Sequence, residues 1–150
     1  MNRWRLLIAG ISLSALCACA AQLETSTPET APSKQAANLS CAEINNTELV
    51  TIRYPAETIY RNGAVLPTKN GLACLEVLSD WLQNGPQNRW QVTVSGEEGY
   101  GFDPLALAGK RQEFLQRFFV RKGVEQKNWQ WQTVVGQEEQ VQFVELKDSP

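Results

Sequence analysis

The pattern of apolar and polar positions predicts an amphipathic helix between residues 104 and 124. The residues at helical spacing are apolar, namely Leu105, Ala108, Leu115, Phe118 and Phe119. The residues between them are polar or charged, namely Lys110, Arg111, Glu113, Gln116, Arg117 and Arg121. This pattern is typical of a helix that packs one stripe against a larger body. Asp103 followed by Pro104 predicts the start of the helix, and Lys122 followed by Gly123 predicts its end.

The same pattern predicts a second helix and four strands. A helical stripe between about residues 68 and 83 contains Leu72, Leu75, Leu78 and Leu82, and is widened by Cys74, Val77 and Trp81. Apolar and polar residues alternate, as in half-buried strands, in four segments: 49–54, 90–95, 129–134 and 141–146. The order β-α-β-α-β-β predicts an α+β two-layer sandwich, with a mixed sheet and both helices on one face. Strands joined through a helix should be parallel, because such crossovers are right-handed.

The N-terminus resembles a bacterial export signal. Two arginines precede an apolar run over residues 6–16, which is too short to span a membrane. The residues that follow resemble a lipobox, in which cleavage leaves an acylated cysteine at the new N-terminus. Cys19 is a better lipid acceptor than Cys17, because Cys17 follows the bulky Leu16. An ordinary signal peptide, cleaved near Ala20 or Ala21, is the alternative.

These features divide the chain into a signal peptide over residues 1–18, a tether over residues 19–40 and a folded domain over residues 41–150. The tether contains prolines and small polar residues, which is typical of a disordered linker. Fully extended, it would span at most about 70–80 Å. Cys19 is followed by Ala20 rather than aspartate, a pattern that resembles lipoproteins sorted to the outer membrane. We therefore expect a lipid-anchored protein of the outer membrane with its domain in the periplasm.

The charge of the mature chain excludes some partners. Loss of residues 1–18 would leave 12 basic and 16 acidic residues, a net charge of −4. Because nucleic-acid-binding proteins carry a basic footprint, we expect no nucleic acid partner. The acidic balance also argues against electrostatic attachment to anionic lipid, so the acyl chains must hold the protein on the membrane.

The cysteines predict a disulfide. With Cys17 removed and Cys19 acylated, Cys41 and Cys74 remain. An even pair in an exported domain favours a disulfide between them. It would close a loop of about 33 residues and stabilise the fold by roughly 3–4 kcal/mol. The alternative is that Cys74 is a small core residue of its helix and Cys41 merely lies nearby.

Several segments resemble, in order, the OmpA-like C-terminal domains of bacterial envelope proteins. Residues 107–124 are similar to that family's L-S-x-R-R-A…K-G-V/I signature, and the agreement extends over residues 48–146. The resemblance implies an OmpA-C-like fold that binds peptidoglycan non-covalently, with an arginine on a carboxylate of the diaminopimelate in the stem peptide. By register this arginine is Arg111, whose guanidinium fork suits a carboxylate. The alternative is a solvated arginine on the helix surface.

The loop before this helix departs from the family pattern. The family's G-H-T-D-x-x-G is replaced by Gly-Glu-Glu-Gly-Tyr-Gly over residues 96–101. The aspartate that pairs with the ammonium of diaminopimelate is therefore missing. Glu97, Glu98 and Asp103 are the candidate replacements, and a solvated acidic loop is the alternative. In the closing strand, Glu139-Gln140 stands where the family has a pair of arginines.

Enzymatic and metal-binding functions have little support in the residues. The sequence contains no histidine, no clustered cysteine pattern and no serine-centred motif. Two adjacent glutamates rarely point at one substrate atom, so we expect neither enzyme activity nor a cofactor. The aromatic residues Tyr100, Phe102, Trp129 and Trp131 are expected in the core, with contact to a ligand as the alternative.

Two functions therefore stay open. The first is an outer-membrane lipoprotein whose periplasmic OmpA-like domain binds peptidoglycan and so tethers envelope layers. The second is an accessory structural lipoprotein of a multiprotein envelope machine, such as a secretion system, that acts through protein contacts and has lost the ligand. Arg111 favours the first, whereas the missing aspartate and the short tether favour the second.

Overall fold

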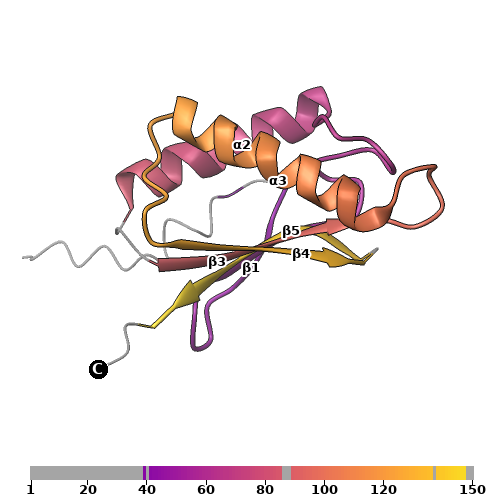
Figure 1. Ribbon diagram of the computed structural model, residues 1–150. Helices are drawn as coiled ribbons and strands as arrows, with labels where there is room; N and C mark the ends of the chain where they lie inside the picture. Colours follow the sequence, from indigo (N-terminus) through magenta and orange to yellow (C-terminus); the bar gives the residue numbers. More distant parts are fainter. Residues whose placement is uncertain (1–38, 40, 86–88, 137, 148–150) are drawn as a thin grey trace, which may run out of the picture.

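The four alternating segments and one further short strand form a five-stranded sheet in the computed structural model, which describes residues 39, 41–85, 89–136 and 138–147. Figure 1 shows the sheet as one layer of the molecule. The strand order across the sheet is β1-β2-β5-β3-β4. The strands are β1 (Glu43–Asn45), β2 (Thr51–Pro55), β3 (Arg89–Gly96), β4 (Trp129–Val135) and β5 (Glu139–Leu146).

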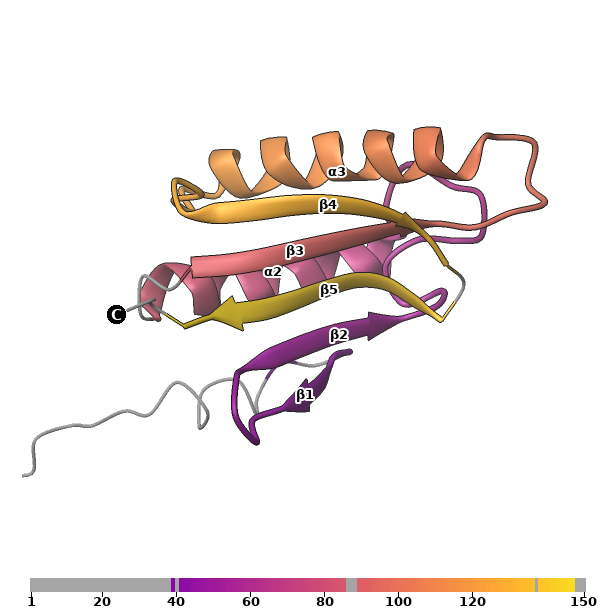
Figure 2. The same ribbon diagram turned by 60° about the horizontal axis from the view of Figure 1, so that its bottom comes forward.

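The strand directions agree with those predicted from the order of elements. β3 and β4, which are joined through a helix, are parallel. β5 lies between β2 and β3 and is antiparallel to both, so β2 and β3 are parallel to each other (Figure 2). The sheet is therefore mixed, as expected. The short strand β1 was not predicted, because among its three residues only Ile44 is apolar and no alternation is visible.

The two helices cover one face of the sheet, as predicted (Figure 1). They are α2 (Lys69–Asn84) and α3 (Pro104–Arg121). Thr68 caps α2 by accepting a hydrogen bond of 2.9 Å from the Gly71 N–H. Asp103 caps α3 by accepting one of 2.8 Å from the Ala106 N–H. Beyond the end of α3, Gly123 has a φ of +78°, the left-handed conformation that the sequence predicted there.

The core lies between the helices and the sheet, but three residues assigned to the helix stripes are exposed. Leu72 is 38% exposed, Val77 39% and Leu105 50%. In α3 the buried positions include Leu107 and Arg111 instead. The correction has a simple physical reason: the sheet faces only a narrow part of each helix surface, so apolar residues at the margins of the predicted stripes stay exposed.

The predictions for the four aromatic residues are half right. Trp129 and Trp131 pack against the core from β4, as expected. Tyr100 and Phe102 are 48% and 50% exposed, so the prediction that they close the loop over the core is wrong. Both belong to the loop between β3 and α3, which projects beyond the ends of the strands (Figure 2).

A disulfide joins Cys41 to Cys74 on α2, as the sequence predicted, with a Cα–Cα distance of 6.1 Å. It attaches the start of the domain to the helical layer. The predicted signal peptide, the lipid acceptor Cys19 and most of the tether lie outside the described residues. Within the part of the chain that the structure describes, neither helix is long and apolar enough to cross a membrane.

Candidate functional site

The candidate site centres on Arg111, which lies on the buried face of α3. Ala108, Arg111, Leu115 and Phe119 follow one another at intervals of three or four residues, and all four have no exposed surface. The interpretation of Arg111 as a solvated surface arginine is therefore wrong. A buried guanidinium is costly unless its N–H groups are hydrogen-bonded and its charge is compensated.

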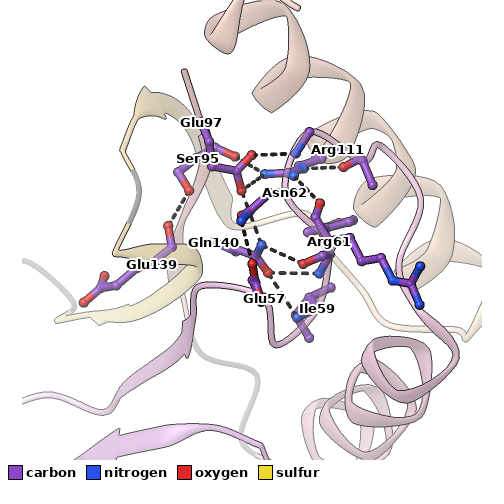
Figure 3. Close-up of polar contacts among 12 residues, drawn as sticks. Glu57, Ile59, Arg61, Asn62, Ser95, Glu97, Arg111, Glu139 and Gln140 are labelled. Carbon is purple, nitrogen blue, oxygen red and sulfur yellow. Dashed lines mark hydrogen bonds and ion pairs between the residues drawn. The ribbon is translucent and has the colours of Figure 1, made fainter. Parts of the chain in front are cut away.

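The side chain of Arg111 is held by acceptors from two separate parts of the chain, the loop over residues 61–64 and the end of β3 (Figure 3). Its Nε donates to the carbonyl oxygen of Ala64 at 2.8 Å, and Nη1 donates to that of Ser95 at 2.9 Å. Nη1 also donates to Glu97 Oε1 at 2.9 Å, and Nη2 lies 3.4 Å from the carbonyl oxygen of Arg61. These contacts direct the guanidinium fork into the protein rather than toward solvent.

Glu97 supplies the opposite charge. It directly follows the last residue of β3, it is 3% exposed, and its Oε1 forms the buried ion pair with Arg111. The same oxygen accepts a 3.3 Å hydrogen bond from Gln140, and Oε2 lies 3.5 Å from the N–H of Gly63. Burial alone would raise the pKa of Glu97, but the hydrogen bond and the charge of Arg111 outweigh it and hold the pKa below its ordinary value.

Gln140 completes this polar centre and was not among the predicted site residues. It is 1% exposed, and its Oε1 accepts hydrogen bonds from the N–H groups of Ile59 and Tyr60 at 3.1 and 2.9 Å. Its Nε2 donates to the carbonyl oxygen of Tyr60 at 2.8 Å. Gln140 thereby fixes the loop that covers Arg111. One signal was present in the sequence: the position carries a neutral amide where the resembled family has an arginine.

The Tyr60 ring provides the other wall around Arg111. The guanidinium carbon lies 4.5 Å from the centroid of this ring, in position for a cation–π contact. Burial raises the pKa of the Tyr60 hydroxyl, and the positive charge of Arg111 partly opposes this. The Tyr60 hydroxyl has no hydrogen-bond partner among the described residues. The ring therefore contributes an apolar surface and a π face rather than a proton donor in use.

Of the three acidic candidates, only Glu97 is brought to Arg111. Glu98 is exposed next to it in the loop. Asp103 is also exposed and serves as the N-cap of α3. The expectation of a solvated acidic loop is thus met by Glu98 and not by Glu97.

Gly96 explains why α3 and β3 can hold the ion pair so closely. A Cβ atom at Gly96 would lie 1.8 Å from the carbonyl oxygen of Pro104, a distance that no side chain tolerates. The absence of a side chain lets the end of β3 lie directly against the first turn of α3. Glu97 follows at once and reaches Arg111, which lies in the second turn.

Chemically, this centre is a buried charge pair. Among the described residues there is no cluster of histidine, cysteine or carboxylate side chains that could hold a metal ion. What the centre offers is one cation and one anion, side by side in a buried environment. Such a pair suits recognition of a ligand that carries both charges, or the internal support of two loops.

No family model matches this sequence, and no curated protein matches it either. Solved structures do match the fold. A putative MotB-like protein from Desulfovibrio vulgaris aligns with a TM-score of 0.64 at 14% identity, covering 79% of this chain and 86% of that chain. The OmpA-like domain of FopA1 from Francisella tularensis aligns with a TM-score of 0.51 at 15% identity, covering 73% and 83%.

A third match is the cell wall anchor of the T6SS from Pseudomonas aeruginosa. It aligns with a TM-score of 0.55 at 9% identity, covering 78% of this chain and 95% of that chain. At such low identities the matches show the fold alone. That fold is the OmpA-like one which the sequence resemblance implied, and the low identities show how far this sequence has diverged from them.

Proposed function

We propose that this chain is a non-enzymatic binding protein of the bacterial envelope, whose OmpA-like domain associates with peptidoglycan. The observation that carries the proposal is the pairing of Arg111 with a carboxylate at the centre of a fold shared with a cell wall anchor. Arginine is the side chain best suited to a carboxylate, and Glu97 is the complement for an ammonium group.

The ligand group that suits this centre is a zwitterion, such as the diaminopimelate terminus of a stem peptide. Its carboxylate would take the place of Glu97 on Arg111, while its ammonium would pair with the displaced Glu97. One internal ion pair then becomes two ion pairs, and neither protein charge is left buried without a partner. Entry requires the covering loop to open, because Arg111 has no exposed surface in the closed form.

Co-sedimentation with purified peptidoglycan sacculi tests this function. The acyl-free chain from residue 20 should pellet with sacculi. Glu97→Gln and Arg111→Lys should each weaken binding at least tenfold, because each weakens one of the two ion pairs with the zwitterion. Glu98→Gln makes the same change of charge at the neighbouring exposed position and should leave pelleting unchanged.

Thermal melts of each variant separate loss of binding from loss of folding. Loss of binding in Glu98→Gln but not in Glu97→Gln would reassign the ammonium partner to Glu98. An acyl-free chain that stays in the supernatant would rule out direct binding through this centre.

A second function is favoured by the closed form of the site. Arg111 is fully buried, and its Nε and Nη1 donate to acceptors of the protein's own loops, so the ion pair also supports these loops. In this case the ion pair holds the loops of a structural subunit, and the domain serves a multiprotein envelope assembly through contacts on its surface. Absence of sacculus binding, together with intact folding, is the result expected of this second function.

The proposal includes a lipid anchor at Cys19 that keeps the domain in the periplasm beside the outer membrane. The lipobox-like sequence and the acidic balance of the mature chain support it. Labelled palmitate should be incorporated into the full chain in cells, and Cys19→Ser should abolish incorporation and release the protein from the membrane fraction. Cys17→Ser is the control and should change neither result. Incorporation that survives Cys19→Ser would contradict the assignment.

A further inference from the structure

A groove of about 630 Å³ lies between the two helices, separate from the Arg111 centre. α3 supplies most of its lining, α2 supplies Leu72 and Glu76, and the loops at one end supply Val65, Leu66 and Phe102. Arg111 is not among the lining residues. The groove therefore opens on the outer side of the helical layer, where the proposed ligand centre does not reach.

The groove is apolar and its apolar side chains are unusually exposed. Phe114 and Phe118 stack along α3, with ring centroids 6.2 Å apart. At the end formed by the loops, Leu66 is 66% exposed and Phe102 is 50% exposed, and Leu72 lies nearby on α2 at 38%. Contiguous exposed apolar residues of this size mark interaction sites in soluble domains.

The charges around the groove are of the opposite sign to the charge of the whole chain. The full chain has a net charge of −2. The charged residues that line the groove are three cations, Lys110, Arg117 and Arg121, and two anions, Glu76 and Glu113, which give a net charge of +1. Glu113 is paired with Arg117, and Glu76 is paired with Lys122.

Two of these cations have no internal anion. Within residues 41–85, 89–136 and 138–147, neither Lys110 nor Arg121 forms an ion pair. They stand at opposite ends of the groove, 11 positions apart on α3. At a rise of 1.5 Å per residue, this separation is about 16 Å along the helix axis.

We propose that this groove is a docking site for an acidic amphipathic segment of a partner protein. Apolar side chains of the segment pack on Phe114 and Phe118, and carboxylates about three helical turns apart pair with Lys110 and Arg121. The chain's own tether fits less well, because residues 19–38 contain only one large apolar residue, Leu23. This inference goes beyond the association with peptidoglycan and does not depend on it.

Fluorescence anisotropy with designed peptides tests the groove on the acyl-free chain from residue 20. The probe is a labelled helical peptide of about 14 residues, with leucines on one face and glutamates about 11 positions apart. Its counterpart has lysines in place of the glutamates. The acidic peptide should bind at least tenfold more tightly than the basic one, and added salt should reduce this difference.

Variants of exposed residues identify the surface without disturbing the core. Lys110→Glu/Arg121→Glu should reverse the preference between the two peptides. Leu66→Ser should weaken the acidic peptide severalfold. Lys127→Glu/Lys147→Glu, which makes the same change of charge at exposed positions outside the groove, should leave the preference intact. All of these variants should bind sacculi as the unmodified chain does. Failure of the groove proposal can therefore be told apart from failure of the proposed peptidoglycan association.

Three results would overturn the inference. Equal binding of both peptides would remove the charge argument, and binding that ignores Lys110→Glu/Arg121→Glu would move the site elsewhere. A strong gain in affinity when residues 20–38 are deleted would show that the tether occupies the groove. Binding to phosphatidylglycerol vesicles that is lost in Leu66→Ser would assign the surface to lipid instead.

Discussion

At the scale of single residues, the charge on Glu97 links the stability of the domain to pH. The folded protein stabilises the carboxylate through Arg111, so the pKa of Glu97 lies below its ordinary value. The carboxylate therefore contributes fully to stability above the pKa of the unfolded chain, which is about 4.3 for glutamate. This contribution disappears as the pH falls through the lower folded pKa.

We expect Glu97→Gln to destabilise the domain by about 3 kcal/mol at neutral pH, because Arg111 then stays buried without an anion. The difference in unfolding free energy between this variant and the unmodified chain should shrink as the pH falls below about 4. Urea unfolding between neutral and strongly acidic pH measures it. Glu98→Gln, which removes an exposed charge, should show neither effect. A difference that stays constant over the whole range would mean that Glu97 is not the titrating group.

The burial of Arg111 shows what the sequence could and could not predict about the site. Its spacing from Ala108 and Leu115 is that of the buried stripe, so its position on α3 was visible. A guanidinium is nevertheless expected at the surface, since burial is costly without acceptors. Those acceptors are mainly backbone carbonyls of Arg61, Ala64 and Ser95, and no side-chain pattern reveals them.

At the scale of secondary-structure elements, two glycines occupy helices under opposite constraints. Gly71 lies in the first turn of α2, where an added Cβ would be 2.1 Å from the carbonyl oxygen of Ile59. Gly109 lies within α3, and an added Cβ would have no neighbour within 4 Å. The first glycine permits close contact between a helix and a loop, whereas the second only reduces helix propensity.

The same substitution should therefore have opposite effects. Gly109→Ala should stabilise the domain by about 0.5–1 kcal/mol, because alanine favours the helix. Gly71→Ala should destabilise it, since the loop carrying Ile59 must move and that loop is bonded to Gln140. Denaturant midpoints of the two variants measure both effects. Stabilisation by Gly71→Ala would show that this loop yields easily, and would weaken the account of how Arg111 is covered.

The elements themselves were largely predictable from periodicity and caps. α3 begins at its predicted cap, Asp103, and α2 begins close to the predicted start of its stripe, because a side-chain acceptor before the first turn is a local signal. The exposed positions Leu105 and Val77 were misassigned, since an apolar residue beside the stripe looks like part of it. Which side of a helix meets the sheet depends on the whole fold.

At the scale of the whole molecule, β5, the last strand in the sequence, lies in the middle of the sheet. β5 pairs with β2 on one side and with β3 on the other. Within the sheet, β5 therefore joins the pair β1 and β2 to the pair β3 and β4. The order of elements predicted the parallel crossovers correctly. It did not predict the insertion of β5 between β2 and β3, because that pairing joins residues far apart in the sequence.

This topology has a consequence for how the domain folds during synthesis. During synthesis, the pair β1 and β2 and the pair β3 and β4 stay unconnected within the sheet until β5 (Glu139–Leu146) has been made. The pairing of β5 with β2 is also slow to form, because it joins residues far apart in the sequence. The sheet thus reaches its native arrangement only after β5 has been made. Under the export proposed above, late closure of the sheet would keep the nascent chain unfolded, and so competent for translocation, until Glu139–Leu146 is made.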